Sequence, residues 1–309
     1  MKPQTIVVLG GTGFVGSHLV PLLQRDGHRI TLLSRQRERH RELGVLPRVA
    51  VVSADVHDGD VLARHLAGAD VAINLVGILN ERGSDGSGFR KAHVELVDTL
   101  IGACARAGVA RLLQMSSLRA GEGDSHYLST RGEAEVRVKA SALAWTLFRP
   151  SVIFGPGDGL FFRFSKLLRM TPVLPLARAH ATFAPVYVGD VAQAFARAVI
   201  HPHTIGRVYE LAGPREIELG ELVRWTARMI GRRRLVIDLP DALGYAQAWL
   251  GEWLPGKPLS RDNFRSLKLD SVAREDGLAA LGIVATPMDA VMPRLLGLDN
   301  RARRRPRKA

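Results

Sequence analysis

The sequence is poor in the residues that brace small secreted proteins or hold metals. Cys104 is the only cysteine among 309 residues, so an intrachain disulfide and a thiolate zinc cluster are both excluded, which fits a reducing cytoplasm. Ten histidines are scattered without metal-ligand spacing, and we predict no metal. No apolar run approaches the roughly 18 residues of a membrane span. The N-terminal segment is apolar only over residues 6–9, which indicates a buried strand rather than a signal peptide.

The composition is that of a globular protein, with 46% hydrophobic and 24% charged residues. At roughly 150 residues per domain, the length allows one large domain or two ordinary ones. A chain of this size buries roughly three quarters of its unfolded surface and needs no covalent support. Whole-chain disorder, collagen-like structure and a disulfide scaffold are therefore excluded.

Positive charge dominates, with a formal net charge of +13, and it is concentrated at the C-terminus. Six cations lie within the last nine residues: Arg301, Arg303, Arg304, Arg305, Arg307 and Lys308. This tail is either a disordered, solvated end or a tether to anionic lipid or an acidic partner, at roughly 1 kcal/mol per charge near a membrane. Specific nucleic-acid binding is disfavoured, because no aromatic residue interleaves with the arginines for base stacking.

The first half of the chain alternates short apolar runs with segments of helical periodicity. Strands are predicted at residues 6–9, 30–33, 49–52, 71–76, 112–115 and 145–148. Helices are predicted at residues 14–24, 61–66, 93–107 and about 129–140. Buried strands alternating with helices indicate right-handed βαβ units, so we predict an α/β fold with a doubly wound parallel sheet of the Rossmann type.

After Pro150 the pattern loosens, and glycine and proline cluster. Strands are predicted at 183–188, 208–211 and 235–237, with helices at 189–200 and 219–230. We therefore expect a Rossmann domain over residues 1–155, completed by residues 183–212, and a smaller interleaved lobe over 156–300. Residues 301–309 would form the basic disordered tail.

A glycine-rich turn follows the first predicted strand and opens the first helix. The sequence Gly10-Gly11-Thr12-Gly13-Phe14-Val15-Gly16 fits the dinucleotide-binding fingerprint. Glycine permits the tight turn, the close approach of a pyrophosphate and close packing of helix on strand. The helix N-terminus then offers free N–H groups to the phosphates.

The end of the second strand bears on the choice of cofactor. NAD sites usually have an acidic residue there for the ribose hydroxyl, but this chain has Ser34 and Arg35, followed by Arg37 and Arg39. A hydroxyl and a cation suit a 2′-phosphate, so we predict NADPH over NADH, although the segment could also be a solvated basic loop.

Two further strand ends supply cofactor contacts. Asp55 and Val56 follow the third strand and are placed to reach the adenine edge, although Asp55 could equally cap a helix. Leu75, Val76 and Gly77 end the fourth strand, where small residues would let the cofactor lie against the backbone.

Polar residues at the end of the fifth strand predict the catalytic position, because ligands bind at the carboxyl edge of such sheets. Ser116 and Ser117 lie there, and Tyr127 and Arg131 would share one face of the next helix. These residues resemble the serine, tyrosine and lysine of extended short-chain dehydrogenases/reductases. The resemblance implies that Tyr127 exchanges a proton with substrate and that Arg131 stands at the lysine position. Ser117 is the better match to the serine, and Ser116 is the alternative.

Further segments, spanning with the glycine turn about residues 5–295, narrow this resemblance. They are AHVE (92–95), RPSVIFGPGD (149–158), APVYVGDVA (184–192), YELAGP (209–214) and LPGKPLSRDN (254–263). Together they resemble the atypical branch that contains the NADPH-binding accessory subunit of respiratory complex I, with bacterial and ubiquinone-biosynthesis relatives. The cofactor would then also contact Tyr127, Arg131, Pro150 and Val152. Arg131 departs from the superfamily pattern, and Ser117 departs from the small apolar residue frequent in this branch.

Three functions follow from the resemblance. The leading hypothesis is an NADPH-binding accessory or assembly factor linked to complex I or quinone metabolism. The alternatives are an active NADPH-dependent reductase or epimerase, and an NADPH-binding redox sensor. Ser117 and Tyr127 favour the active reductase or epimerase, whereas Arg131 disfavours it because arginine does not release its proton.

A mostly apolar segment at 238–254 contains Trp249 and Trp253. Such a helix suits a membrane interface or a quinone-like lipid, or it packs within the smaller lobe. We therefore expect a cytoplasmic protein that can lie on the inner face of the cytoplasmic membrane.

Overall fold

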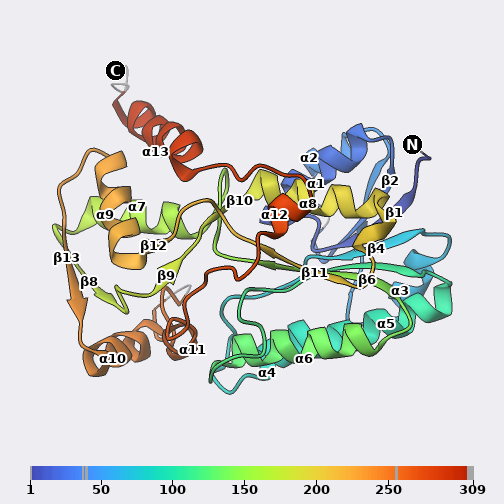
Figure 1. Cartoon of the computed structure of the whole chain (residues 1–309), viewed down its shortest axis with the longest axis horizontal. Helices are drawn as coiled ribbons and strands as arrows, with labels where there is room; N and C mark the ends of the chain where they lie inside the picture. Colours follow the sequence, from blue (N-terminus) through green and yellow to red (C-terminus); the bar gives the residue numbers. More distant parts are fainter. Residues whose placement is uncertain (1, 37, 39–40, 255–256, 305–309) are drawn as a thin grey trace.

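The computed structural model describes residues 2–36, 38, 41–254 and 257–304, and it is built around one parallel sheet (Figure 1). Seven strands form the sheet in the order β11-β6-β5-β4-β1-β2-β3, and every pairing is parallel. This confirms the predicted Rossmann-type fold. The strands are β1 (Thr5–Leu9), β2 (Arg29–Ser34), β3 (Val49–Ser53), β4 (Val71–Asn74), β5 (Arg111–Met115), β6 (Ala144–Pro150) and β11 (Arg207–Leu211).

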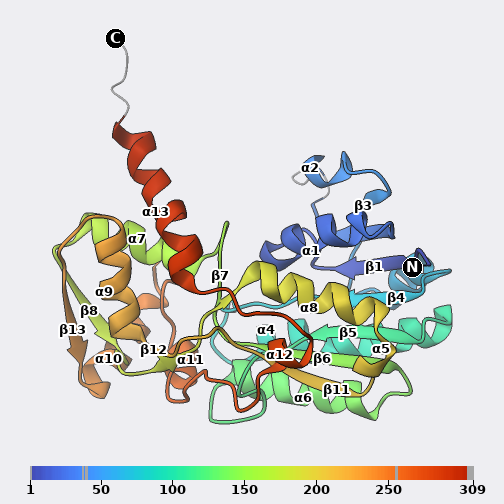
Figure 2. The same ribbon diagram turned by 45° about the horizontal axis from the view of Figure 1, so that its top comes forward.

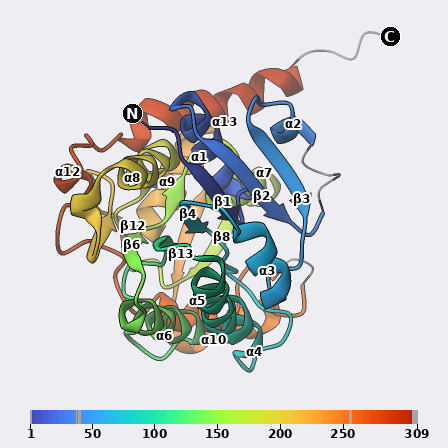
Figure 3. The ribbon, with the colours of Figure 1, turned by 90° about the vertical axis from the view of Figure 1, so that its right-hand side faces the viewer.

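Helices cover both faces of the sheet, which is why its strands are continuous apolar runs (Figure 3). Successive residues of β1 alternate between the two cores, with Ile6 and Val8 in one and Val7 and Leu9 in the other. The first core is closed by α1 (Phe14–Arg25) and α8 (Val188–Ile200). The second is closed by α3 (Gly59–Leu66), α5 (Leu96–Ala107) and α6 (His126–Ala140). The short α2 (Arg41–Gly44) precedes β3.

Two predicted boundaries in this domain were wrong. The fourth strand ends at Asn74 and not at residue 76, because the Asn74 side-chain oxygen accepts a hydrogen bond from Val76 N–H at 3.0 Å and turns the chain. The helix predicted at 93–107 begins earlier, as α4 (Ser87–Arg90) and a π-helical turn, η2 (Lys91–Glu95), ahead of α5. Such turns occur frequently at functional sites.

The smaller lobe has a core of its own, formed mainly by α7 (Leu160–Met170), α9 (Leu219–Met229) and α13 (Met288–Arg304). Around it lie short two-stranded pairings: β8 (Val173–Ala177) with β13 (Leu235–Leu239), and β9 (Thr182–Phe183) with β12 (Ile217–Glu218). The strand predicted at 183–188 is split into β9 and β10 (Val186–Tyr187), which pairs with β7 (Ile153–Phe154).

The two parts of the chain interleave twice. Residues 186–211 return to the large sheet as predicted, through β10, α8, the turn η3 (Pro202–Thr204) and β11. A second return was not predicted: residues 271–287 lie along the Rossmann domain with α12 (Gly277–Ala280) before the chain re-enters the smaller lobe (Figure 2). Leu278, Leu281 and Ile283 belong to the Rossmann core. The interval 156–300 is therefore not one continuous lobe.

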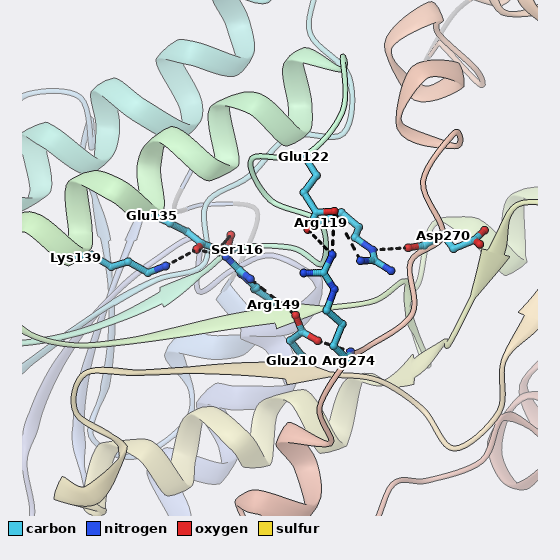
Figure 4. Close-up of polar contacts among 9 residues, drawn as sticks. All are labelled: Ser116, Arg119, Glu122, Glu135, Lys139, Arg149, Glu210, Asp270 and Arg274. Carbon is cyan, nitrogen blue, oxygen red and sulfur yellow. Dashed lines mark hydrogen bonds and ion pairs between the residues drawn. The ribbon is translucent and has the colours of Figure 1, made fainter.

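A chain of ion pairs and hydrogen bonds supports the second return (Figure 4). The buried Glu135 carboxylate accepts hydrogen bonds from Arg149, Ser116 and Lys139. Arg149 also lies 3.8 Å from Glu210, whose carboxylate accepts a hydrogen bond from Arg274 N–H at 2.6 Å. At the other end, Arg274 and Arg119 both contact Glu122, and Arg119 donates to the Asp270 carbonyl. Helix α6 and the sheet are thus tied to the returning segment.

The C-terminal segments also differ from expectation. Residues 301–304 continue α13 as helix, so the predicted disordered tail does not begin at 301, and residues 305–309 lie outside the described chain. The apolar segment 238–254 is helical only as α10 (Asp241–Gly251), because Asp238 and Leu239 belong to β13. It is followed by α11 (Arg261–Ser266). Within the described residues, no helix combines the length and the apolar character needed to cross a bilayer.

Candidate functional site

The glycine turn joins β1 to α1 and approaches neighbouring backbone closely. Gly10 has φ +73°, and a Cβ there would lie 3.0 Å from Val76 N. A Cβ on Gly16 would lie 2.2 Å from the Gly11 carbonyl oxygen. Helix α1 begins after Gly13, and no side chain caps its N-terminus. The first-turn N–H groups therefore remain for an anion, as a pyrophosphate would require.

The rest of the turn faces the chain that links the two lobes. Thr12, Phe14 and Val15 are half-buried, and Gly13 is exposed. The Phe14 ring lies 3.7 Å from the Cβ position of Gly157, and His18 Nε2 is 3.0 Å from the Pro156 carbonyl oxygen. The loop after β7 thus lies beside the turn that would hold the phosphates.

The structure places Ser34 and Arg35 at the carboxyl end of β2. Ser34 is buried and its hydroxyl accepts a hydrogen bond from Gln36 N–H at 3.3 Å, whereas Arg35 is exposed and has no hydrogen-bond partner among the described residues. Burial is the main cause of the lowered pKa of His57. The negative charge of Asp55 raises this pKa, whereas the positive charges of Lys91 and Arg35 lower it. Arg35 therefore acts electrostatically on the segment after β3. Arg37 and Arg39 lie outside the described residues.

Asp55 does not cap a helix, which was the alternative for this residue. Its carboxylate accepts a hydrogen bond from His57 N–H at 3.0 Å, whereas Asp58 caps α3 by accepting hydrogen bonds from Asp60 and Val61 N–H groups. Val56 is buried in the core, so only its main chain is available to a ligand.

At the end of β4, Gly77 lies against Arg131. A Cβ on Gly77 would lie 2.0 Å from Arg131 Nη2, so only glycine leaves room for the guanidinium. Leu75 N–H still donates to the Leu9 carbonyl at 2.9 Å. Leu75, Val76 and Gly77 therefore form a backbone wall between the glycine turn and Arg131.

Helix α6 brings Tyr127 and Arg131 together. Ser125 caps this helix by accepting a hydrogen bond from Leu128 N–H, so it begins three residues earlier than predicted and includes Tyr127. Arg131 Cζ lies 5.6 Å from the centre of the Tyr127 ring. Arg131 is 6% exposed, and its Nη1 donates to the Met115 carbonyl at 3.0 Å, while its buried Nε has no partner within the described chain.

The two serines after β5 have different roles. Ser116 Oγ donates to Glu135 at 2.7 Å, so its hydroxyl is engaged in the ion-pair chain. Ser117 Oγ is buried and has no hydrogen-bond partner among the residues described. An unpartnered buried hydroxyl is costly, and a ligand would supply the missing partner. This geometry favours Ser117 over Ser116 as the site serine.

His93 belongs to the segment 92–95, and the sequence predicted no role for its side chain. The structure places it beside Tyr127. Its ring centre lies 5.6 Å from that of Tyr127. Its Nδ1 lies 2.9 Å from Thr130 Oγ1. Because this hydroxyl donates its own hydrogen to the His126 carbonyl, it accepts from Nδ1, which therefore carries the ring proton. The other ring nitrogen, Nε2, accepts from Ile78 N–H at 3.5 Å. Burial and the charge of Arg131 lower the pKa of His93 to about 2. A neutral His93 thus orients the tyrosine ring.

Pro150 and Val152 lie where β6 leaves the sheet. Pro150 is buried, and its carbonyl accepts a hydrogen bond from Leu118 N–H at 3.1 Å. The Val152 carbonyl accepts from Val186 N–H at 2.9 Å, and its side chain packs on the smaller lobe. Both residues lie in the connection between the two parts of the chain.

A cavity of about 100 Å³ lies near Tyr127 and is lined by the neighbouring His126. The Phe89 ring is in its lining and lies 6.0 Å from the Tyr127 ring, and Asp262 accepts hydrogen bonds from the His126 and Tyr127 N–H groups. Four residues of the proline-rich segment line it, namely Lys257, Ser260, Arg261 and Asp262, whereas Pro255 and Gly256 lie outside the described residues. The lining residues are Glu81, Gly83, Ser84, Phe89, His126, Glu252, Lys257, Ser260, Arg261, Asp262 and Arg265.

Sequence reasoning gave no site role to Asp262 or Arg265. Asp262 is 135 residues away from Tyr127 in the chain, and no periodicity connects positions so far apart. The predicted absence of a metal stays a prediction; among the described side chains, no group of three or more His, Cys, Asp or Glu could hold one.

Comparison with known proteins agrees with this arrangement. An NAD(P)H-binding family model matches residues 10–159. A ceramide reductase of Caulobacter vibrioides is 32% identical over 245 residues, which are 76% of this chain and 74% of that protein. Subunit 9 of the NADH dehydrogenase [ubiquinone] 1 alpha subcomplex from Rattus norvegicus is 26% identical over 294 residues, with 91% and 77% coverage.

The solved structures show the same fold. DesIV, a dTDP-glucose 4,6-dehydratase from Streptomyces venezuelae with NAD and TYD bound, superimposes with a TM-score of 0.77 at 20% identity, covering 98% of this chain and 100% of that one. At this identity the likeness concerns the fold alone.

Proposed function

The chain belongs to the atypical extended branch of the short-chain dehydrogenase/reductase superfamily, and we propose that it is an NADPH-binding accessory or assembly factor of a respiratory or quinone-metabolising membrane system. In this proposal the dinucleotide serves mainly as a structural ligand. A relative that matches 91% of this chain and is named as a subunit of the NADH dehydrogenase [ubiquinone] 1 alpha subcomplex supports the partner class. Arg35, whose guanidinium has no partner among the described residues, supports the preference for NADPH. The guanidinium of Arg131 is already engaged, which supports the weak chemistry.

The residues fit a nicotinamide dinucleotide. The Gly10–Gly16 turn and the uncapped N-terminus of α1 would hold the pyrophosphate. Ser34 and Arg35 would hold the 2′-phosphate, and Asp55 with the Val56 main chain would lie near the adenine. The wall at Leu75, Val76 and Gly77 would support the nicotinamide half beside Tyr127 and Arg131. When bound, such a cofactor supplies a hydride.

One observation carries the accessory assignment: Arg131 is a buried, fixed guanidinium where the superfamily has lysine. It donates to the Met115 carbonyl and occupies the space left by Gly77. A guanidinium keeps its proton in proteins, so it can hold charge near a ribose but does not relay protons to Tyr127. We infer that turnover is absent or slow.

Replacing Arg131 by lysine is therefore expected to raise the rate of NADPH oxidation with model quinones or ketones. A restored proton relay should give about 100-fold, the lower end of what proton-transfer catalysis contributes. Rates are measured by NADPH absorbance, and Arg137→Lys, an exposed position on the same helix, is the matched control. A fast wild-type rate that falls in Arg131→Lys would reject the accessory assignment and establish the enzyme.

Nucleotide retention is measured on the same preparations. NADP(H) released from the purified protein by heat, and a higher melting temperature with NADPH, are expected for a structural ligand, since ligand at 100 times Kd stabilises by about 2.7 kcal/mol. Protein that neither retains nor responds to either dinucleotide would contradict the proposal.

The second candidate function is an NADPH-dependent reductase. It is favoured by the unpartnered Ser117 hydroxyl and by the cavity beside Tyr127. The relative named as a ceramide reductase supports it. The Arg131→Lys comparison separates this candidate from the accessory role.

Contact with an anionic membrane is the third element of the proposal. Figures 1 and 2 place the end of α13 on the opposite side of the smaller lobe from α10. The end of α13 and the tryptophan-bearing helix therefore lie on separate sides of this lobe. Only α10 lies beside the cavity, through Glu252 and α11.

A further inference from the structure

We propose that the cavity between α11 and the 81–89 loop binds the anionic phosphate headgroup of a membrane lipid, whose chains lie on the exposed apolar face of α10. This inference rests on the membrane association in the proposed function and is independent of NADPH binding.

Helix α10 is apolar on nearly every side, yet only its small residues are buried. Gly244, Ala248 and Gly251 face the rest of the lobe, where Ala177, Phe264 and Leu259 pack. A helix without a polar face is normally enclosed by protein. Here an aliphatic and aromatic face is open to solvent, formed by Leu243, Tyr245, Trp249, Leu250, Trp253 and Leu254.

The side chains of this apolar face are strongly exposed to solvent. Trp253 is 78% exposed and Leu250 is 59% exposed, and between Asp241 and Glu252 the helix carries no charge. The Trp249 and Trp253 rings lie edge to face, with centres 6.4 Å apart. Tryptophans are enriched at the boundary between headgroups and acyl chains, where one side of the ring is apolar and the N–H is wet.

The cavity lies next to the end of this face, because its lining includes the residue that directly follows α10. Glu252 follows α10, lines the cavity and is held by the Arg261 guanidinium at 3.0–3.1 Å. A volume of about 100 Å³ holds a few polar atoms, since one water takes roughly 30 Å³ in the liquid. It accommodates a headgroup and not an acyl chain, so the chains must lie outside, along α10.

Each carboxylate oxygen of the lining already accepts at least one hydrogen bond. The Glu81 carboxylate accepts from Gly86 and Gly88 N–H groups at 2.8 Å. The Asp262 carboxylate accepts from the start of α6, and that of Glu252 from Arg261.

The Arg265 guanidinium, by contrast, has no hydrogen-bond or ion-pair partner in the described part of the chain, although it lines the cavity. Lys257 Nζ donates to the Arg82 and Gly83 carbonyls and retains a third N–H. Three carboxylates and three cationic side chains line the cavity, and the donors that remain on Arg265 and Lys257 favour an acceptor-rich anion. Phosphate is the anion that membrane lipids present.

An occupant of this cavity would lie beside the candidate catalytic position. It would touch Phe89, whose ring packs on Tyr127, and would lie near Asp262, whose carboxylate accepts a hydrogen bond from Tyr127 N–H. Lipid at the membrane surface and nucleotide in the Rossmann domain would thus meet at the start of α6.

The test is co-sedimentation of the full chain with phosphatidylcholine vesicles, with and without phosphatidylglycerol. Anionic vesicles should bind the wild type more tightly, and Arg265→Ala should lower that partitioning about fivefold, at roughly 1 kcal/mol per interfacial charge. Trp249→Ala with Trp253→Ala should lower it at least about tenfold and abolish the blue shift of tryptophan fluorescence, since each ring buries substantial apolar area.

Two control variants leave the C-terminal tail unchanged, and one of them alters the net charge by the same amount as Arg265→Ala. Arg228→Ala removes an exposed arginine of α9, and Val284→Ala with Val136→Ala trims exposed apolar residues elsewhere. Both should change partitioning less than about twofold. Equal effects of Arg265→Ala and Arg228→Ala would overturn the headgroup site, because the binding would then be general surface electrostatics.

Other occupants give different results. Glycerol 3-phosphate that binds as tightly as the vesicles would overturn the lipid in favour of a soluble phosphate. A dimer in solution that the two tryptophan substitutions abolish would assign the face to a second copy and overturn the proposal. NADP(H) content is measured in every variant. Loss of nucleotide with the vesicle pattern intact would reject the proposed function and leave this inference standing.

Discussion

Replacing Glu135 by glutamine is expected to lower the free energy of unfolding at neutral pH by about 3 kcal/mol, the low end for breaking a buried ion pair. Glu135 is 2% exposed, and its carboxylate accepts hydrogen bonds from Ser116 and Arg149 at 2.6–2.8 Å. Without that charge Arg149 is left with Glu210 alone, 3.8 Å away. This partial compensation is the reason to expect the low end.

The loss should depend on pH in a defined direction. Burial raises the pKa of the Glu135 carboxyl, but hydrogen bonds from Arg149 and Ser116 and the nearby charges outweigh burial, so this pKa lies below its usual value. A carboxyl group with a lowered folded pKa stabilises the fold above its unfolded pKa of about 4.3, and the stabilisation is lost as pH falls. Glutamine does not titrate, so wild type and variant should converge as the pH falls through the lowered folded pKa of Glu135.

Urea unfolding at neutral and acidic pH measures both effects, with Glu133→Gln as the matched control. Glu133 is two residues earlier on the same helix and pairs with Arg90 and Arg137 at the surface. Such exposed pairs contribute about 0–1 kcal/mol. An equal loss in the two variants would show that the chain of contacts in Figure 4 adds nothing beyond ordinary surface pairs.

The Rossmann half was predictable because its signals are local. Each strand is a continuous apolar run, since both faces of the sheet are covered, and the seven strands were all expected. The glycine turn is likewise a local pattern, and Gly10 and Gly16 stand where a side chain would collide with backbone. Tyr127 and Arg131 were expected on one helical face because they are four residues apart, and α6 places them so.

The smaller lobe was harder because its elements are short and their contacts are distant. Helix α7 follows a segment rich in glycine and proline, and no helix was predicted there. Helix α13 contains Pro293, although proline is normally unfavourable in the interior of a helix. The side chains that close the cavity reach Tyr127 from more than a hundred residues away, as Asp262 does. His93 resembles a core residue in the sequence, and only the fold reveals its contact with Tyr127.

The wild type is expected to bind NADPH about 10- to 150-fold more tightly than NADH, and Arg35→Asp is expected to abolish or invert this preference. Arg35 directly follows β2, next to the buried Ser34, and has no partner among the described side chains, so its guanidinium is available to a 2′-phosphate. A charge-assisted pair of this kind contributes about 1.5–3 kcal/mol, which gives the expected ratio. An aspartate at the same position would instead repel the phosphate and accept from a ribose hydroxyl.

Titration calorimetry with both dinucleotides measures the preference, and Arg29→Asp is the control that separates a contact from a general field. Arg29 is exposed at the opposite end of the same strand, about 20 Å from Arg35 at roughly 3.3 Å per residue. That distance exceeds the Debye length of about 10 Å at 0.1 M salt, so the same change of charge should leave the preference nearly unaltered. Equal affinity of the wild type for NADPH and NADH would reject the assignment of Arg35. A similar loss in both variants would mean that overall positive charge, and not a contact at the end of β2, selects the phosphorylated cofactor.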